Sequence, residues 1–209
     1  MQGDYGHWYV KYVPFQMKKI KLALFASGNG TNVEAIICYF RHHPIIQVAL
    51  VLSNNKNAYA LKRAGNHGIP QSSFSRTEFY QTDLVIHQLQ EFEVNWVILA
   101  GFMWLVPQPL LAMYPRTMVN IHPALLPSYG GKGMYGDHVH QAVLENGEMV
   151  SGITIHYVNP QYDEGNIIFQ AKCRVKKDDT KDKLAKRVHQ LEHKYYPQII
   201  ERLCQGDLQ

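Results

Sequence analysis

The chain has 209 residues, of which 46% are hydrophobic and 18% charged, a balance that predicts a folded domain and excludes a disordered chain. Its formal net charge of +4 is too small, and its basic residues too dispersed, to predict a nucleic-acid partner. No apolar stretch is long enough to span a bilayer and the start lacks a secretory signal, so we expect no membrane partner. Three distant cysteines without a Cys-x-x-Cys motif favour a reduced, cytoplasmic protein.

Residues 1–16 are rich in aromatic side chains but show no periodic pattern, and Met17 resembles a natural start just before the first strand. We therefore expect 1–16 to be an N-terminal extension that is not part of the fold. Residues 17–209 are expected to form a single domain.

The first predicted strand covers 20–26, and a glycine turn, Ser27–Asn32, follows it. An apolar helical pattern begins after the turn, and Thr31 or Asn32 is expected to cap that helix. Such a turn aims backbone N–H groups at an anion. It is not a dinucleotide fingerprint, because the third glycine position holds Val33 and no acidic residue ends the second strand. The pattern favours a phosphate monoester held by Gly30, Thr31 and Asn32, with a plain tight turn as the alternative.

The middle of the chain alternates extended and helical patterns. After the last of these strands, Gly101–Val106 is an unusually apolar loop. Large apolar loop residues can line a pocket for a flat ligand, or they can simply plug the end of a sheet. The predicted strands cover 47–53, 69–74 and 94–100, and the predicted helices cover 57–65, 76–91 and 109–114.

Met118–His122 is the central predicted strand. Asn120 and His122 project from the same face because side chains alternate along a strand, and Pro123 ends the strand. An amide and an imidazole therefore lie together at a carboxyl end, where open α/β sheets bind ligands. The amide can donate to a developing oxyanion, and the imidazole can donate or move a proton. The alternative is a polar strand end with two incidental side chains.

The last part of the chain is predicted to pair two strands in antiparallel fashion, because only a short turn links them. The first of the two alternates apolar and polar residues and is expected to be half exposed. The fold class is therefore α/β and Rossmann-like, a mostly parallel twisted sheet with helices on both faces and an antiparallel strand pair toward the C-terminus. The predicted elements are a glycine-rich mobile loop over 128–136, a helix over 137–146, strands over 150–158 and 166–175, and a helix from Thr180 to Leu203.

With these elements placed, the chain resembles the folate-dependent glycinamide ribonucleotide formyltransferase family from about Lys19 to Leu203. Asn-x-His-Pro, Leu-Leu-Pro and Asp-x-Gly in this order are typical of folate formyltransferases, and the glycine-asparagine turn is typical of this branch. The matching segments are Ser27–Asn32, Ala100–Met103, Asn120–Pro127, Gly152–His156 and Asp163–Gly165.

The resemblance implies the formyltransferase fold and an enzyme that moves the formyl group of N10-formyltetrahydrofolate, its co-substrate, to the amine of glycinamide ribonucleotide in purine biosynthesis. It implies these two small-molecule partners, no metal, and a monomer or homodimer. Two departures concern the folate contacts: Trp104 stands where Arg is usual, and the Gly130–Gly136 loop is several residues longer. The implied catalytic residues are Asn120, His122 and Asp163; the ribonucleotide-binding residues are Gly30, Thr31, Asn32, His189 and Glu192; and the folate-binding residues are Arg76, Met103, Trp104, Leu105, Val106, Asn120, Asn159, Pro160, Gln161, Tyr162 and Asp163.

In the implied mechanism, Asn120 and a protonated His122 donate hydrogen bonds to the oxyanion of a tetrahedral intermediate. Asp163 favours the imidazolium and helps to relay a proton. A zinc hydrolase is the competing enzyme, because His189, Glu192 and His193 match His-x-x-Glu-His, but its third ligand has no room before Gln209. Methionyl-tRNA formyltransferase and formyltetrahydrofolate deformylase share the three catalytic residues and are two further alternatives. Each has an additional domain, which argues against both. A non-catalytic binding module is the last alternative, but ligand binding alone does not require the set Asn120, His122 and Asp163.

Overall fold

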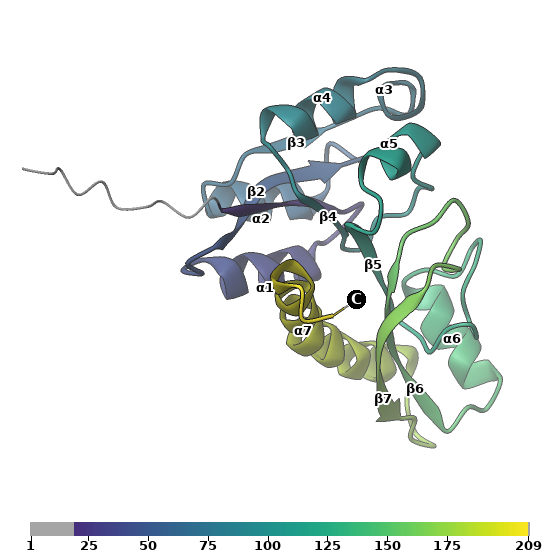
Figure 1. The fold of residues 1–209 in the computed structure, drawn as a ribbon. Coiled ribbons are helices and arrows are strands. Elements are labelled where there is room, and N and C mark those ends of the chain that lie inside the picture. Colours follow the sequence, from purple (N-terminus) through teal and green to yellow (C-terminus); the bar gives the residue numbers. More distant parts are fainter. Residues whose placement is uncertain (1–18, 209) are drawn as a thin grey trace, which may run out of the picture.

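The computed structural model describes residues 19–208, so the predicted extension 1–16 lies outside the described residues. Its sheet has the strand order β3-β2-β1-β4-β5-β6-β7 (Figure 1). Neighbouring strands from β3 to β5 are parallel, whereas β6 pairs antiparallel with both β5 and β7. The predicted fold class is thereby confirmed. The strands are β1 Ile20–Phe25, β2 Ile46–Ser53, β3 Gln71–Ser73, β4 Trp96–Leu99, β5 Met118–His122, β6 Val150–Tyr157 and β7 Ile167–Arg174.

Helices cover both faces of the sheet because its central strands are apolar on both faces. Leu22 and Leu24 of β1 belong to a core shared with α1, α2 and α7, whereas Ala23 and Phe25 face a second core shared with α3, α4 and α5. All four of these side chains are fully buried. The helices are α1 Thr31–Phe40, α2 Tyr59–Asn66, α3 Arg76–Gln81, α4 Leu84–Glu91, α5 Gln108–Met113, α6 Asp137–Glu145 and α7 Lys181–Gln205.

The strand order reverses next to β1, which pairs with β2 on one side and with β4 on the other. The chain therefore leaves β1 and β4 in opposite directions, and a crevice opens at their carboxyl ends. The turn after β1, the loop after β4 and the end of β5 meet at this crevice. The topology thus joins the three segments that the sequence pattern had singled out.

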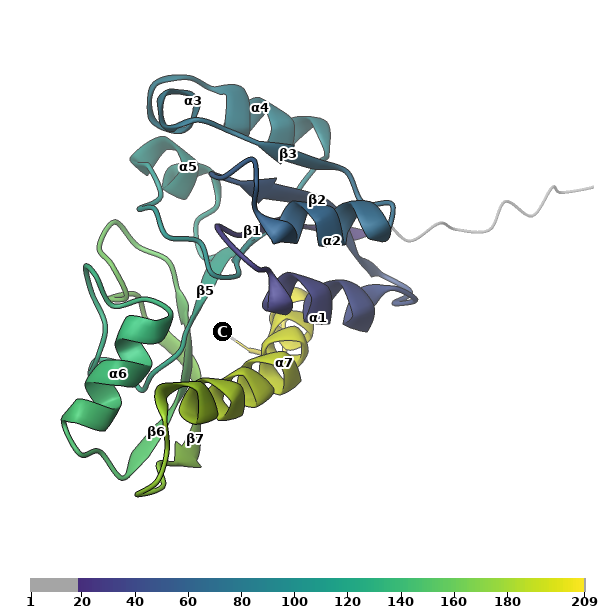
Figure 2. The same cartoon turned by 180° about the vertical axis from the view of Figure 1, so that it is seen from behind.

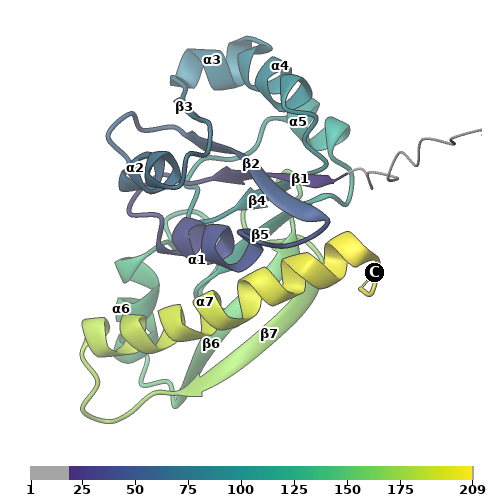
Figure 3. The same ribbon diagram turned by 90° about the vertical axis from the view of Figure 1, so that its left-hand side faces the viewer.

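The long helix α7 packs against α1, β6 and β7 and also contacts α6 (Figures 2 and 3). The Thr180 side chain caps its start by accepting from the Lys183 N–H, as predicted. The buried Tyr196 hydroxyl donates to the Leu99 carbonyl at 2.9 Å and contacts the Val119 carbonyl at 3.2 Å. These bonds fix α7 against the neighbouring strands β4 and β5 and bring Glu192, one turn earlier, to the crevice.

One prediction about the extent of an element and one about the burial of a strand were wrong. The single helix expected over 76–91 is two helices, because the backbone of Thr82 is extended and its hydroxyl bonds to the Glu78 carbonyl and the Leu84 N–H. The strand over 150–158 was expected to be half exposed, but Thr154 and His156 are buried. Among residues 19–208, no helix has the length and apolar character needed to cross a bilayer.

Candidate active site

A cavity of about 560 Å³ lies at the carboxyl ends of β1, β4 and β5. Its walls come from the glycine turn, the loop after β4, the end of β5, the glycine-rich loop and helices α6 and α7. It brings together most of the residues that the resemblance had implied. Those that line it are Gly30, Thr31, Asn32, Met103, Asn120, His122, Tyr162, Asp163, His189 and Glu192.

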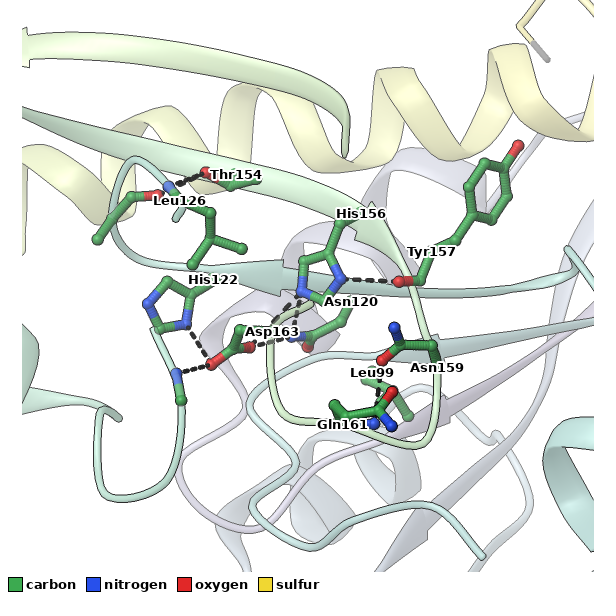
Figure 4. A network of polar contacts seen from close by, with 12 residues as sticks. Leu99, Asn120, His122, Leu126, Thr154, His156, Tyr157, Asn159, Gln161 and Asp163 are labelled. Atoms are coloured by element: carbon green, nitrogen blue, oxygen red, sulfur yellow. Dashed lines mark hydrogen bonds and ion pairs between the residues drawn. The ribbon is translucent and has the colours of Figure 1, made fainter. Parts of the chain in front are cut away.

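The three residues of the implied catalytic set converge at the end of β5 (Figure 4). Nδ1 of His122 lies 3.5 Å from one oxygen of Asp163, and Nδ2 of Asn120 lies 3.4 Å from the other. Asn120 is half-buried and His122 is only 3% exposed. A hydrogen-bond donor, an imidazole and a carboxylate therefore share one partly dry corner of the cavity, where electrostatic interactions are stronger than in water.

Asp163 reaches this corner because of a tight backbone approach. A Cβ at Gly165 would lie 1.6 Å from the carbonyl oxygen of Tyr157, so only glycine lets the turn lie against β6. Asp163 itself adopts a φ of 58°, a left-handed conformation that Asp tolerates better than most residues. The Gly131 N–H donates to its carboxylate at 3.0 Å. The Asp-x-Gly motif thus has a geometric reason.

The pKa of Asp163 lies below its usual value. Burial alone would raise this pKa, but the neighbouring His156 and His122 rings and the Gly131 N–H outweigh burial. Asp163 is therefore a carboxylate at neutral pH.

His156 is a site residue that the sequence analysis missed. Its Nδ1 lies 2.8 Å from the Tyr157 carbonyl oxygen, so Nδ1–H donates there and leaves Nε2 as an acceptor. Nδ2 of Asn120 lies 3.1 Å from that Nε2 (Figure 4). The imidazole therefore fixes which way the Asn120 amide points. The signal available for His156 was its position two residues after Thr154, on the strand that pairs with β5.

Two opposing effects act on His122: Asp163 favours the imidazolium, as expected, but burial disfavours it more strongly. Burial lowers the pKa of His122, and the opposing effects of Asp163 and the Tyr129 carbonyl do not fully offset it. The ligand-free site therefore favours the neutral imidazole at neutral pH, so the protonated ring expected in the tetrahedral intermediate would gain its proton during the reaction. Its Nε2 lies 2.7 Å from the Tyr129 carbonyl oxygen, so it is held on both edges by oxygen atoms.

The glycine turn makes α1 start without a side-chain cap. Gly30 is itself the N-cap residue, with a φ of 72°, so the prediction that Thr31 or Asn32 caps the helix was wrong. A Cβ at Gly30 would lie 2.5 Å from the Cβ and 2.7 Å from the Cα of Ala60, which excludes any larger residue without a shift of α2. The N–H groups at the start of α1 thus face the cavity without competition from a capping side chain.

Beside the turn, three buried polar groups line the cavity. Nδ2 of Asn32 donates to Glu192 at 3.0 Å, and burial raises the pKa of Glu192 to about 7 despite this bond. Oδ1 of Asn32 and Nδ1 of His140 are buried and have no partner among the described residues. His140 is 1% exposed, and burial lowers its pKa to about 4. Unpartnered buried polar atoms in a cavity wall are expected to bond a polar ligand.

The remaining implied folate residues do not line the cavity. The Arg76 guanidinium lies over the rings of Tyr80 and Trp104, at 5.1 Å and 5.4 Å from their centroids. Trp104 belongs to an aromatic cluster next to the cavity, and Val106 is buried in the core. The implied folate-binding residues that lie outside the cavity wall are Arg76, Trp104, Leu105, Val106, Asn159, Pro160 and Gln161.

The competing zinc motif does not assemble. The rings of His189 and His193 stack at 6.2 Å, while Glu192 turns to Asn32. Within residues 19–208, the His/Cys/Asp/Glu group whose ligand atoms come close enough for one ion lies elsewhere.

Fold and site together define an α/β protein that presents hydrogen-bond donors and a carboxylate at a topological switch point. The family model described as formyl transferase matches residues 20–200, and the chain belongs to this family. Solved structures of formyltransferases also resemble this chain. A glycinamide ribonucleotide transformylase 1 from Symbiobacterium toebii superposes with a TM-score of 0.84 at 34% identity, covering 93% of this chain and 92% of that one.

Curated relatives are similar along most of this chain. A phosphoribosylglycinamide formyltransferase of Bacillus subtilis is 38% identical over 190 residues, which are 88% of this chain and 94% of the relative. A chloroplastic phosphoribosylglycinamide formyltransferase of Arabidopsis thaliana is 39% identical over 194 residues, or 90% of this chain. The chain spans 66% of the length of that plant relative and 19% of a trifunctional purine biosynthetic protein of Gallus gallus.

Proposed function

We propose that this protein transfers the formyl group of N10-formyltetrahydrofolate to the primary amine of phosphoribosylglycinamide, a step of purine biosynthesis. The observation that carries the proposal is the convergence of Asn120, His122 and Asp163 in the wall of a cavity that the glycine turn also lines. The names of the relatives support the same reaction.

The glycine turn and the buried polar groups around it would bind the acceptor. The phosphate would accept from the N–H groups of Gly30, Thr31 and Asn32 at the start of α1, where the helix dipole also favours an anion. The ribosyl glycinamide part would extend toward Glu192, which can accept from its N–H or O–H groups, and past His189. The unpartnered atoms of Asn32 and His140 would bond to the same molecule.

The folate would enter from the side of the loop after β4. Met103, Tyr162, Asn120 and Asp163 line that side of the cavity. The outer residues Arg76, Trp104, Leu105, Val106 and Asn159–Gln161 would contact the part of the folate that projects beyond the cavity. The stacked Arg76 keeps its positive charge and is available to an acidic tail of the folate.

The reaction forms one C–N bond and breaks another. The neutral amine attacks the formyl carbon, and Asn120, joined by His122 once this ring is protonated, donates a hydrogen bond to the oxyanion that develops. Neutral His122 takes the amine proton, and the nearby Asp163 carboxylate stabilises the resulting imidazolium. When the bond to the folate N10 breaks, this proton passes to N10. The steps leave the protein unchanged and need no metal ion.

The folate absorbance provides the test. Protein is mixed with a formylated folate analogue, with and without phosphoribosylglycinamide, and the deformylated folate is followed over time. The proposal predicts product only when the acceptor is present, and formylated acceptor in equal amount. Deformylation without the acceptor would instead indicate a hydrolase, and the absence of any product would indicate a binding module.

A further inference from the structure

Three metal-ligating side chains gather outside the cavity, on the surface between α1 and α2. Glu34 and Cys38 are one turn apart on α1, and His67 follows the last residue of α2. The ligand atoms of the three all lie within 4.8 Å of one another. One carboxylate oxygen of Glu34 is shared, at 2.6 Å from Nε2 of His67 and 3.6 Å from Sγ of Cys38.

The contacts of this shared oxygen, Oε1, are with the other two candidate ligands, His67 and Cys38. The neighbouring cation, Arg63, lies 3.3 Å from Oε2, the other oxygen of Glu34, and also holds the carbonyl and side-chain oxygens of Asn29 at 2.9 Å. An ion bound on Oε1 would therefore not need to displace Arg63. Cys38 is exposed, and the side chains of Glu34 and His67 are 33% and 19% exposed, so the group is open to solvent.

We propose that Glu34, Cys38 and His67 form a binding site for a borderline-soft divalent cation, of which Zn²⁺ fits best. A thiolate, an imidazole and a carboxylate are the ligand types that zinc prefers, and three protein ligands leave a fourth position for water. The thiolate and the carboxylate supply two negative charges, which balance those of the ion. Metal–ligand bonds of about 2.0–2.3 Å require only a small separation of the present contacts.

Binding is a proton-releasing step. The Cys38 thiol loses its proton to solvent when sulfur bonds the ion, and His67 must be neutral at Nε2. No electron is transferred. The site lies on two packed helices and contains no residue of the cavity, so its ion would be structural and not part of formyl transfer. Failure of this proposal would leave the proposed function untouched.

Metal titration of the reduced, full-length protein tests the site. Isothermal calorimetry with Zn²⁺ is expected to show one ion per chain. Co²⁺ is expected to give the near-ultraviolet absorption of a cobalt–thiolate bond. Cys38→Ser should abolish this absorption, and Cys38→Ser and His67→Ala should each weaken Zn²⁺ binding by more than the ~10-fold that loss of an outer partner costs.

Matched variants identify the site even if one of these does not fold. Glu34→Gln keeps the shape of the side chain but removes the ligand charge, and it should also weaken Zn²⁺ binding. Cys204→Ser and His87→Ala change the same residue types elsewhere and should bind like the unchanged protein. Absence of Zn²⁺ binding in the unchanged protein, or a cobalt–thiolate absorption that survives Cys38→Ser, would overturn the proposal.

Discussion

Gly165 lies so close to Tyr157 that a Cβ at position 165 would be 1.6 Å from the Tyr157 carbonyl oxygen. This contact holds the turn that places Asp163 between His122 and His156, at 3.5 Å and 3.6 Å from their ring nitrogens. The position of the Asp163 carboxylate is therefore set by the absence of a side chain at Gly165.

We predict that Gly165→Ala lowers kcat at least ~10-fold, because a displacement of a positioned group by about an ångström is costly in catalysis. It should also destabilise the fold, since backbone must move. Gly65→Ala is the control, as no atom lies within 4 Å of its added Cβ, and it should be neutral or stabilise by up to about 1 kcal/mol. Steady-state kinetics and urea unfolding measure both effects. Full activity of Gly165→Ala would contradict this account of the turn.

A second prediction concerns the amide of Asn120, which His156 orients. His156→Leu should lower kcat by about 10-fold with little change in either KM, because the amide then loses the partner that fixes its direction. Thr154 is on the same strand as His156, and Thr154→Val removes a buried hydroxyl that bonds Ala124 and Leu126 in the segment after β5 but does not bond Asn120. It should cost stability, by about 1–3 kcal/mol, but retain kcat. Equal kcat losses in the two variants would show that His156 acts only through stability.

The third prediction follows from the electrostatics of His122. Asp163 raises the pKa of His122 while burial lowers it by more, so Asp163→Asn should lower this pKa further. The titration is measured by NMR of the imidazole protons in the ligand-free protein. The proposed mechanism needs a neutral ring, so kcat/KM of the unchanged enzyme should rise with pH through a value below 6.5. A pKa that increases in Asp163→Asn would contradict the assignment.

Glu192 gives a prediction about stability and pH. Because burial raises its pKa from 4.5 to about 7, the folded state prefers the protonated form, and its contribution to stability is lost as pH rises through that range. Glu192→Gln keeps the acceptor for Asn32 and removes this penalty. It should be more stable than the unchanged protein by about 3 kcal/mol above pH 8, and by little below pH 4.5. Urea unfolding at both pH values measures the difference in the free energy of unfolding between the two proteins. A difference that does not change with pH would contradict the ionisation of a buried Glu192.

Much of the fold was predictable because local patterns and topology agree. The apolar strands, the short connections and the turn after β1 lead to a parallel sheet with one switch point, and alternation along β5 places Asn120 beside His122. The burial of β6 was not predictable from alternation. Thr154 is buried because the segment after Pro123 folds back and bonds its hydroxyl, a contact between residues about thirty positions apart.

The parts of the site that the sequence could not supply depend on the same kind of long-range contact. His156 and His140 resemble surface histidines in the sequence. Only the packing of β6 beside β5 brings His156 to Asn120, and only the packing of α6 beside α7 brings His140 to the cavity. The neutral state of His122 likewise depends on burial, which no local pattern reports. Conversely, the resemblance named outer residues such as Arg76 that are separated from the cavity wall of the protein without ligands.

The most direct test of the central claim is the single-turnover rate of formyl transfer in His122→Ala, measured alongside calorimetric binding of phosphoribosylglycinamide. We predict that the rate falls at least ~100-fold, the usual contribution of a positioned acid–base group, while the dissociation constant of the acceptor stays unchanged. A variant that binds the acceptor and transfers the formyl group at the unchanged rate would contradict the role of this corner of the cavity.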